Sequence, residues 1–595
     1  MIINALAKYY DILAEDEDSD IALPGFSEIK VSYALNLSGK GHLLNIIPLE
    51  ISNGTRNMPR MMMVPEQFKR AGTKPYPYFL CDKAEYMLGL AKTNAGQKEK
   101  NKAEEKFNAF KKMNCEILKK SETEEGNAVI DFLNTWNCID AAENPIVAEY
   151  KDAIEKNGNL VFKIEGKNSF VHQNKKIQEV WLAIQNAADD DENSLCIITG
   201  EKTPIARVHP AISGLYGGQT MGNTLIGFQK GAGAYESYGK KDSQGFNSPV
   251  GKSTVFAYGT VLNKLLSNNE SKMHFGDTTM IFWAETSSDA YRDAFAIIMD
   301  PGELHETSGN QRDPVAIKEI RGILEKISDG EMVKDNSLFD DTVQFHILGL
   351  SPNAARISIR FYMENSFGYF IKNIQQHYSD IKIERQYESE TVIIPPWKIL
   401  KETVAPTSKD KSASPVLSGS LMRAILNGQE YPRSLYESIM IRIRADKKIN
   451  YIKSSIIKGY FLRYCKAENC KEVLQVSLNE SSVNKSYLLG RLFAVLEKTQ
   501  KDANPNINAT IKDRYFNSAC GTPGNVFPVL LKLSNHHISK AEYGYINENR
   551  IKTILDKLEA DKEPFPKRLS LDEQGLFILG YYHQMNALYK KKEDN

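Results

Sequence analysis

The stretch KETVAPTSKDKSASPVLSGS, residues 401–420, separates two different patterns of hydrophobic residues. It is rich in Ser, Pro, Lys and Thr and has little apolar surface to bury, so it predicts a linker. After it, apolar residues recur with the 3.6-residue period of a helix. The sequence therefore predicts a helical bundle over residues 421–595, with a core at about residues 483–595. Two of the stripes are Leu488, Leu489, Leu492, Phe493 and Leu496, and then Val526, Val529, Leu530 and Leu533.

Before the linker, predicted strands and helices are mixed. The runs VQFHILGL and RISIRFY flank SPNAA (residues 351–355), which predicts a hairpin. The acidic run ADDDEN ends a predicted helix, and residues 186–194 are a candidate sub-boundary. We therefore expect a mixed α/β region with antiparallel strands over residues 1–400 and an α+β fold for the chain as a whole. The predicted strands are residues 43–51, 160–165, 195–199, 279–285, 343–350 and 356–362, and the predicted helices are residues 83–90, 97–120 and 253–266.

The composition is that of a soluble globular protein. Of the 595 residues, 25% are charged and 42% are hydrophobic, and the length predicts several domains. No apolar run approaches the roughly 20 residues of a membrane span, and the N-terminus lacks the features of a signal peptide. The seven cysteines are odd in number and scattered, which suits reduced thiols. We therefore expect a cytoplasmic protein without a membrane partner.

The charge is distributed unevenly although the formal net charge is zero. Residues 416–595 contain 28 Lys and Arg against 19 Asp and Glu, a net charge of +9, so the preceding part carries −9. A basic C-terminal third is consistent with a polyanionic partner. Solvated helix faces explain the same counts equally well.

No catalytic or metal-binding motif is recognisable. The GKST run at residues 251–254 has Phe246 where a phosphate-binding loop needs its first glycine, and Pro249 lies inside the loop. The GAG run at residues 231–233 lacks the third glycine of a dinucleotide fingerprint. Cys465 and Cys470 have no second pair to complete a zinc site. We therefore expect no enzymatic activity, no cofactor and no metal ion.

Residues 199–239 contain nine glycines interleaved with basic, amide and tyrosine side chains. Glycine allows close backbone approach to a partner, and basic and amide side chains donate to phosphates and base edges. This segment predicts a surface for an anionic partner. Its candidate donors are Arg207, Gln219, Asn223 and Lys230.

A second candidate surface is FKRAGTKPYPYFLCD, residues 68–82. Its cations Lys69, Arg70 and Lys74 surround a glycine and precede Tyr76 and other aromatic residues. Cations that neutralise phosphates and rings that stack on bases are typical of nucleic-acid surfaces. A proline-rich loop that packs its aromatic residues inward is an equally good interpretation.

The predicted bundle carries basic residues that could line a groove for a single nucleic-acid strand. Some of these arginines will instead form surface ion pairs. The candidates are Arg423, Arg433, Arg442, Arg444, Lys512 and Arg514.

With these segments assembled, the chain resembles, from end to end, the large subunit of the type I-C CRISPR surveillance complex, Cascade. The resemblance rests on long blocks in one order, and their specificity exceeds that of any single motif. They are MIINALAKYYDILAED, PGFSEIKVSYALNL, KRAGTKPYPYFLCD, TGEKTPIARVHPAISGLYGGQTMGNTLIGFQKGAGAYESYGK, NSPVGKSTVFAYGTVLN, FHILGLSPNAARISIRFY, GSLMRAILNGQEYPRSL, INATIKDRYFNSACGTPGNVFPVLLKL and FPKRLSLDEQGLFILGYYHQ.

The resemblance implies a non-catalytic subunit that reads the protospacer-adjacent motif (PAM) in double-stranded DNA and starts duplex opening. Lys69, Arg70, Thr73, Lys74 and Tyr76 then become candidates for PAM contact and wedge formation, with the glycine-rich segment next. The bundle would support the displaced non-target strand.

The partners implied are the backbone and crRNA-processing subunits of Cascade with their crRNA, the target DNA, and a helicase-nuclease. A small subunit made from the chain's own C-terminal region is also implied, and we expect it to begin between Met440 and Leu488. Two other classes stay open: a nuclease or nucleotide hydrolase of antiviral defence, and a purely structural scaffold of a ribonucleoprotein.

Overall fold

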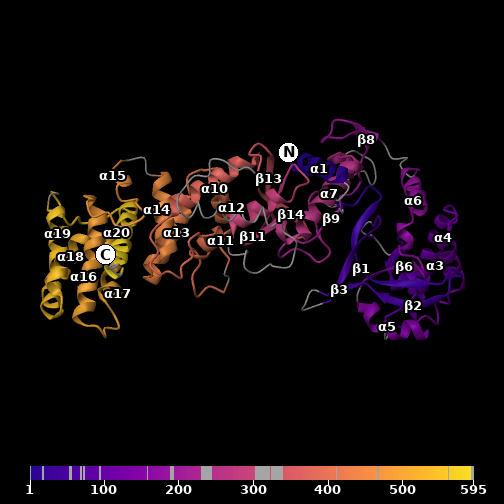
Figure 1. Ribbon diagram of the computed structural model, residues 1–595, viewed down its shortest axis with the longest axis horizontal. Helices are drawn as coiled ribbons and strands as arrows, with labels where there is room; N and C mark the ends of the chain where they lie inside the picture. The colour runs from indigo at the N-terminus through magenta and orange to yellow at the C-terminus, as the bar shows by residue number, and fades with distance from the viewer. Residues whose placement is uncertain are drawn as a thin grey trace. The chain divides into compact units, whose positions relative to one another are not determined.

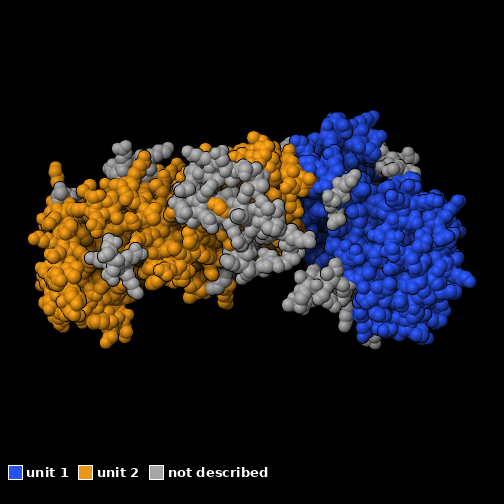
Figure 2. Space-filling view, viewed as in Figure 1, with its two compact units in different colours: residues 1–214, 218–267, 354–357 blue, residues 215–217, 268–353, 358–595 orange. Residues whose placement is uncertain are grey.

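The computed structural model describes residues 2–16, 19, 21–52, 57–67, 70, 74–92, 95–156, 158–187, 193–228, 244–301, 322, 339–409, 412–464, 468–559 and 562–590. The chain forms two compact units, which Figure 2 distinguishes by colour. Unit 1 comprises residues 1–214, 218–267 and 354–357, and unit 2 comprises residues 215–217, 268–353 and 358–595. Strands mixed with helices precede a long helical region (Figure 1), which confirms the predicted α+β class.

Strand β1 (Phe26–Leu37) is central in the sheet of unit 1. It pairs antiparallel with β2 (Leu43–Pro48) and β4 (Asn57–Pro65), and parallel with β6 (Asn159–Ile164). Residues 31–37 of β1 are all buried, as expected for a strand that is covered on both faces. The short strands β3 (Glu50–Ser52) and β5 (Cys81–Lys83) pair with β4 and β6.

Hydrophobic side chains pack on both faces of this sheet. Leu35, Leu37 and Phe162 belong to the larger cluster, whereas Ala34 and Val161 belong to a smaller one. The larger cluster also contains the buried sides of the surrounding helices. These are α2 (Ala84–Met87), α3 (Gln97–Leu118), α4 (Glu124–Thr135), α5 (Pro145–Lys156) and α6 (Lys175–Ala187).

The remainder of unit 1 combines two packed helices with short strands. Helix α1 (Ile2–Glu15) lies against α7 (Lys252–Ser267), with the Tyr10 and Phe256 rings edge to face at 5.8 Å. The predicted strand at 195–199 is wrong, because the Gly200 N–H donates to the Cys196 carbonyl at 2.9 Å and closes a turn. The short elements are η1 (Val171–Gln173), β7 (Asn193–Leu195), β8 (Lys202–Pro204), β9 (Ala211–Ile212), β10 (Asn223–Thr224) and η2 (Gln244–Asn247).

The sheet of unit 2 contains β11 (Lys272–Phe275), β12 (Thr278–Ala284), β13 (Gln344–Asn353) and β14 (Arg356–Ser366) in that order. The neighbouring positions of β13 and β14 confirm the predicted hairpin. Every residue of β12 is buried. Phe282 on β12 packs against Phe295 of helix α8 (Ala290–Met299), with ring centroids 4.8 Å apart.

Helices make up the rest of unit 2 apart from turns and the short η3 (Asn269–Ser271), as far as the structure describes it. They are α10 (Phe367–Ile381), α11 (Pro396–Lys401), α12 (Pro415–Leu426), α13 (Arg433–Asp446), α14 (Tyr451–Tyr464), α15 (Glu468–Lys471), α16 (Lys485–Ala503), α17 (Ile511–Gly521), α18 (Pro523–Lys540), α19 (Gly544–Leu558) and α20 (Leu571–Tyr589).

The predicted linker at 401–420 does not divide the chain into its compact units. Ala413 and Leu417 are buried in a hydrophobic core that runs from Met273 in β11 to Met585 in α20. Residues 415–420 also form the start of α12, where Pro415 occupies the first turn, as proline often does. The low hydrophobicity of the segment marks a connection between packed helices of one unit.

The predicted helical stripes are confirmed except in α18. Leu488, Leu492 and the other residues of their stripe are buried in α16, whereas Val529 and Leu533 of α18 are 47% and 41% exposed. The buried side of α18 is instead Val526, Phe527 and Leu530. Positions 526, 527 and 530 follow the i, i+1, i+4 spacing of one helix face, so 529 and 533 lie on the adjacent row.

Helices α16 and α20, the first and last of the predicted bundle core, pack with their backbones in close contact. A Cβ at Gly490 would lie 1.9 Å from the Phe577 carbonyl oxygen, and a Cβ at Gly580 would lie 2.1 Å from the Tyr487 carbonyl oxygen. Only glycine fits at either position, because real Cβ atoms do not approach within 3.0 Å. Reciprocal glycines therefore fix the register of the two helices.

Candidate nucleic-acid interface

The segment that contains Lys74 and Tyr76 is fixed at its base by α3 and the sheet of unit 1. Asn114 of α3 is fully buried; its Oδ1 accepts the Leu80 N–H at 2.9 Å and its Nδ2 donates to the Tyr78 carbonyl at 3.2 Å. Leu80 has a φ of 54°, which is unusual for a residue with a side chain. Phe79 stacks on Trp181 with centroids 5.1 Å apart. The base of the segment is therefore rigid.

Arg70 is part of the same base. Its guanidinium lies between the rings of Tyr78 and Tyr86, 3.9 and 4.0 Å from their centroids. Its Nη2 donates to Oδ2 of Asp82 at 2.5 Å, and its Nε donates to the Tyr76 carbonyl at 2.7 Å. The Asp82 side chain is 0% exposed. Burial raises the pKa of Asp82, and the Arg70 guanidinium opposes this rise.

This arrangement changes the expected role of Arg70, because a DNA contact would compete with its ion pair. The residues that face solvent are Lys74, which is exposed, and Tyr76, which is 56% exposed. Lys69 and Thr73 lie outside the described residues. Of the aromatic residues in the loop, Phe79 packs inward and Tyr76 is exposed, and the nucleic-acid interpretation stays a prediction.

In the glycine-rich segment, Asn223 has a structural role. It is 1% exposed, and its Nδ2 donates to the Ala354 carbonyl at 2.8 Å and to the Arg356 carbonyl at 3.3 Å. Its Oδ1 accepts the Gln219 N–H at 3.0 Å, which closes a turn. A contact of the Asn223 side chain with DNA would therefore compete with these internal hydrogen bonds. Gln219 and Arg207 are exposed, and Lys230 lies outside the described residues.

The GKST run is a packing element of unit 1. The Gly251 N–H donates to the buried sulfur of Cys196 at 3.3 Å, and a Cβ at Gly251 would lie 2.6 Å from Cγ2 of Thr203. Gly251 also forms an isolated bridge with Ile205. The absence of a side chain at Gly251 thus allows this segment to pack closely against residues 203–205. Lys252 is the first residue of α7.

The six predicted cations of the bundle differ in availability. Arg423 donates to the Ser420 hydroxyl at 3.2 Å, and Arg433 pairs with Glu437 one turn away at 2.9 Å. Arg442 pairs with Asp446, and Arg444 donates to Oε1 of Gln574 at 2.5 Å. Burial lowers the pKa of Lys512, whose Nζ lies 5.0 Å from the Tyr581 ring centroid. Arg514 on α17 is exposed.

One basic region of the bundle was predicted from the sequence only at Arg514, without Lys532 and Lys540. Residues 514–541 contain Arg514, Lys532 and Lys540 but no Asp or Glu. Lys532 and Lys540 are exposed on α18, and Tyr543 and Tyr545, which follow, are 60% and 63% exposed. The absence of Asp and Glu from residues 514–541 is the signal that would have extended the prediction from Arg514 to Lys532 and Lys540.

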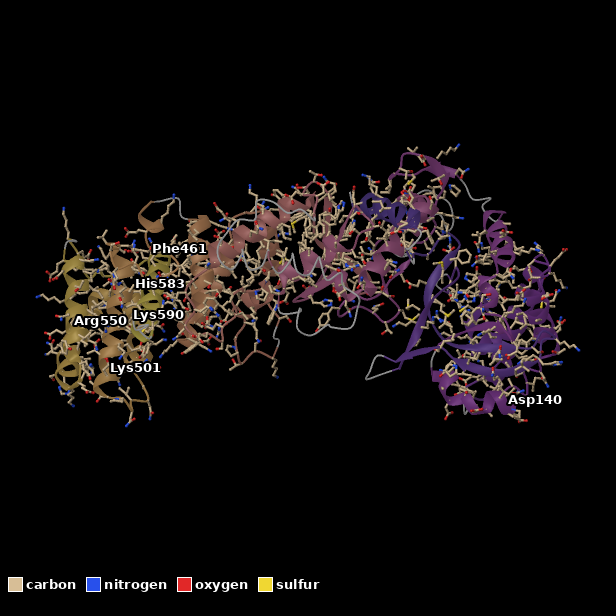
Figure 3. The ribbon with its side chains drawn as sticks, viewed as in Figure 1. Asp140, Phe461, Lys501, Arg550, His583 and Lys590 are labelled. Atoms are coloured by element: carbon tan, nitrogen blue, oxygen red, sulfur yellow. The ribbon has the colours of Figure 1, made fainter. Side chains whose placement is uncertain are left out.

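Other bundle cations are engaged within the helices. Lys501 pairs with the buried carboxylate of Glu497 at 2.8 Å, and Arg550 donates to Oδ1 of Asn547 at 3.1 Å. Figure 3 labels Lys501 and Arg550 among the side chains of the bundle. By contrast, Arg514 of α17 and Lys532 and Lys540 of α18 are exposed. No described helix is long and apolar enough to cross a membrane. Within the described residues, no cluster of His, Cys, Asp or Glu could hold a metal ion.

The model of the CRISPR-associated protein family Csd1 matches residues 6–589, nearly the whole chain. The chain belongs to the Csd1 family. This membership makes it a component of a CRISPR Cascade complex and agrees with the resemblance to the type I-C large subunit. The comparison with curated protein sequences gives no match.

Proposed function

We propose that this Csd1-family chain is the non-catalytic large subunit of a type I-C Cascade complex, and that it binds target DNA through two separate surfaces. The first is the exposed tip formed by Lys74 and Tyr76, which reads the PAM region and starts duplex opening. The second is the basic, carboxylate-free region of α17 and α18, which supports the displaced non-target strand. We also propose that the chain helps to recruit a helicase-nuclease, and that the complex is a cytoplasmic ribonucleoprotein.

The observation that carries the proposal is the construction of the tip. Lys74 and Tyr76 are exposed, yet the residues below them are held by Asn114 and by the Arg70–Asp82 ion pair. A cation and an aromatic ring on a rigid base contact a duplex with little loss of conformational entropy. The cation neutralises a phosphate, and the ring is able to stack on an opened base.

The test uses the assembled complex and a duplex that carries the PAM. We expect Lys74→Ala with Tyr76→Ala to weaken binding at least tenfold while the complex still assembles, and Lys74→Ala alone to lower the salt slope by about 1. Lys98→Ala, which removes an exposed lysine from α3, is the matched control. Unchanged affinity of the double variant at moderate salt would remove the tip from the proposal. Failed assembly with normal DNA affinity would instead favour a structural scaffold.

A matching experiment addresses the bundle. Arg514→Ala with Lys532→Ala should weaken binding of single-stranded DNA and slow R-loop formation, while PAM-duplex affinity stays within about twofold, because separate surfaces act independently. The control is Lys552→Ala with Lys562→Ala, which removes two exposed lysines outside the region. Equal effects of both pairs would indicate a general charge effect.

We also propose that the separately made small subunit begins before Glu472. The Oε1 of Glu472 accepts from the Ser482 hydroxyl at 2.8 Å and from the Asn484 N–H at 3.1 Å. Asn484 in turn caps α16, accepting the Tyr487 N–H at 3.1 Å. A product that begins at Leu488 would lack both. Mass spectrometry of the expressed full-length gene locates the start, and a fragment that begins after Glu472 would contradict this placement.

A further inference from the structure

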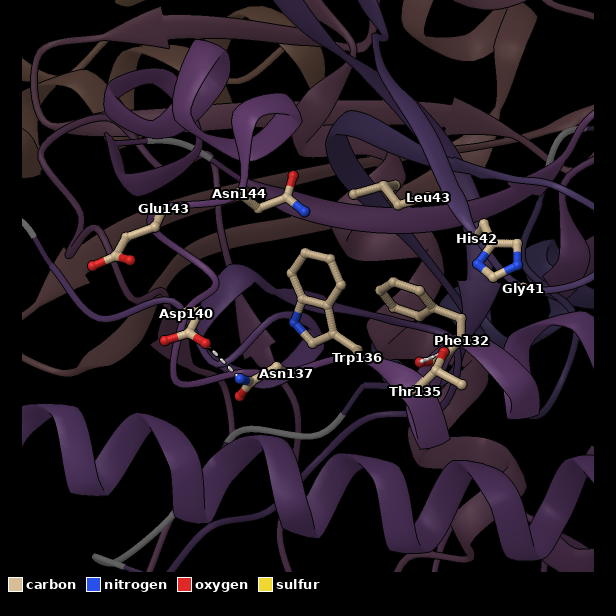
Figure 4. Close-up of a pocket in the computed structure, with 10 residues that line it drawn as sticks. All are labelled: Gly41, His42, Leu43, Phe132, Thr135, Trp136, Asn137, Asp140, Glu143 and Asn144. Atoms are coloured by element: carbon tan, nitrogen blue, oxygen red, sulfur yellow. Dashed lines mark hydrogen bonds between the residues drawn. The ribbon is translucent and has the colours of Figure 1, made fainter.

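A cavity of about 640 Å³ opens in unit 1 between the turn after β1 and the loop that joins α4 to α5. Its apolar wall includes Trp136 and Phe132, whose ring centroids lie 5.2 Å apart. The indole is fixed because Nε1 of Trp136 donates to the Leu88 carbonyl at 3.0 Å. Figure 4 shows the Trp136 ring between Phe132 on one side and Asp140 on the other.

The polar wall of the cavity carries two carboxylates, Asp140 and Glu143, which have no cationic partner among the described residues. The neighbouring amides are used within the loop: Nδ2 of Asn137 donates to Oδ2 of Asp140 at 2.6 Å, and Oδ1 of Asn144 accepts the Ile146 N–H at 3.0 Å. Asn137 thereby orients the Asp140 carboxylate. The amides and one oxygen of Asp140 are thus engaged within the loop, but among the described residues neither carboxylate forms an ion pair.

The segment on one side of the cavity lacks basic residues, whereas Lys40 precedes the lining residue Gly41 and Lys167 pairs with Glu124 and Glu125. Residues 121–150 contain no Lys or Arg. A surface of this charge repels a polyanion and attracts a cation. The two carboxylates that line the cavity, Asp140 and Glu143, are therefore complementary to a cationic side chain of a protein partner. The carboxylates of this stretch belong to Glu122, Glu124, Glu125, Asp131, Asp140, Glu143 and Glu149.

We propose that this cavity binds an arginine side chain of a protein partner. The planar guanidinium stacks on the Trp136 ring and donates to the carboxylates of Asp140 and Glu143, a combination of cation–π contact and charge-assisted hydrogen bonds. Arginine fits better than lysine, because its flat fork both stacks and bonds in two directions. Ile139, which is 75% exposed in the same loop, offers an apolar contact to the residue beside that arginine.

The site does not depend on DNA binding by this chain, so the two proposals are tested separately. The first experiment replaces the tryptophans of the full chain with 5-fluorotryptophan and assigns the ¹⁹F signal of Trp136 with Trp136→Phe. Argininamide is the probe, and citrullinamide is its uncharged analogue of nearly the same shape. We expect argininamide to shift the Trp136 signal in a saturable way and citrullinamide to leave it unchanged.

Variants identify the carboxylates as the cause. Asp140→Asn with Glu143→Gln should weaken argininamide binding at least tenfold, and the asparagine retains an oxygen for the Asn137 donor. Glu149→Gln with Asp152→Asn removes the same charge from exposed positions of α5 that do not line the cavity, and should leave binding unchanged. Equal shifts with both probes, or equal losses in both variants, overturn the proposal. A saturable Trp136 shift with a thymidine oligonucleotide overturns it as well.

The second experiment tests for the partner in the assembled complex. A photo-crosslinking amino acid replaces Ile139 at the rim, and the crosslinked peptides are sequenced. We expect a peptide of another protein that contains an arginine, with the crosslink lost in the Asp140→Asn, Glu143→Gln background. Crosslinks to nucleic acid, or an unchanged pattern in that background, overturn the assignment. Normal DNA affinity of the same variant separates this result from failure of the proposed DNA-binding function.

Discussion

Replacing Arg70 tests whether this arginine stabilises unit 1 or serves chiefly as a ligand contact. Arg70→Ala leaves the fully buried Asp82 carboxylate without its cation and removes the guanidinium between two tyrosine rings. Breaking a buried ion pair in this way costs about 3–5 kcal/mol. Because the Arg70 side chain is 24% exposed, we take the lower end, about 3 kcal/mol. Arg70→Lys keeps the charge but loses the planar guanidinium and its stacking between the two tyrosine rings, which should lower the stability of unit 1 by about 1 kcal/mol.

The assay must report each unit separately, because the chain does not unfold as one two-state domain. Trp136 and Trp181 lie in unit 1, and Trp283 and Trp397 lie in unit 2. Urea titration of the fluorotryptophan-labelled chain therefore follows both units in one sample. With a slope of about 2–3 kcal/mol per molar urea, Arg70→Ala should lower the unit 1 midpoint by about 1–1.5 M and leave unit 2 unchanged.

The pH dependence gives the result an independent check. Without the guanidinium, the pKa of the buried Asp82 rises further above its unfolded value. The folded form of the variant then binds the Asp82 proton more tightly, so the contribution of Asp82 to stability is largest at acidic pH and falls as the pH rises through the range between the two pKa values. Asp82→Asn added to Arg70→Ala should abolish this dependence. An Arg70→Ala midpoint equal to that of the parent chain at neutral pH would refute the reasoning.

Three further predictions follow from packing and burial. Gly490→Ala should destabilise unit 2 by more than about 3 kcal/mol in urea unfolding, because its Cβ would meet backbone atoms rather than a movable side chain. The control is Gly521→Ala, because a Cβ at Gly521 would have no atom within 4 Å. Gly251→Ala should cost unit 1 about 1–3 kcal/mol by forcing Thr203 aside, and Gly39→Ala, also in open space, should not. Burial lowers the pKa of His583 to about 3, so the unfolded chain binds the proton first, and unit 2 should lose stability as the pH falls below about 6.5. Burial also lowers the pKa of His377 in the same unit, so His583→Gln should reduce the slope of that part of the profile without abolishing it, and an identical slope would contradict the assignment.

The sequence predicts the helical elements well because their signals are local. The periodic apolar residues of α16 and the hairpin signal between β13 and β14 need only neighbouring residues, and both predictions are confirmed. The extent of the second unit was not predictable in the same way. Whether residues 401–420 end a domain depends on Ala413 and Leu417 reaching a core built from distant segments.

The candidate site shows the same difference between local features, which the sequence predicts, and contacts with distant segments, which it does not. Residue types indicated which segments carry cations, but not which cations are engaged inside the protein. Arg70 is held by a buried aspartate twelve residues away, and Asn223 by carbonyls of residues 354 and 356, and neither partner has a sequence signal. The cavity was not predicted from the sequence, because the candidate sites were chosen for their basic residues and residues 121–150 contain no Lys or Arg.

The backbone contact between α16 and α20 also has a consequence for synthesis on the ribosome. Gly490 lies near the start of the bundle core and Gly580 near its end, so their helices are separated by almost the whole length of that core. Contacts between such distant segments form late, and a fold that depends on them forms slowly. The nascent bundle therefore has to wait, with the apolar side of α16 uncovered, until α20 has emerged from the exit tunnel, and this holds whether translation began at residue 1 or at an internal start.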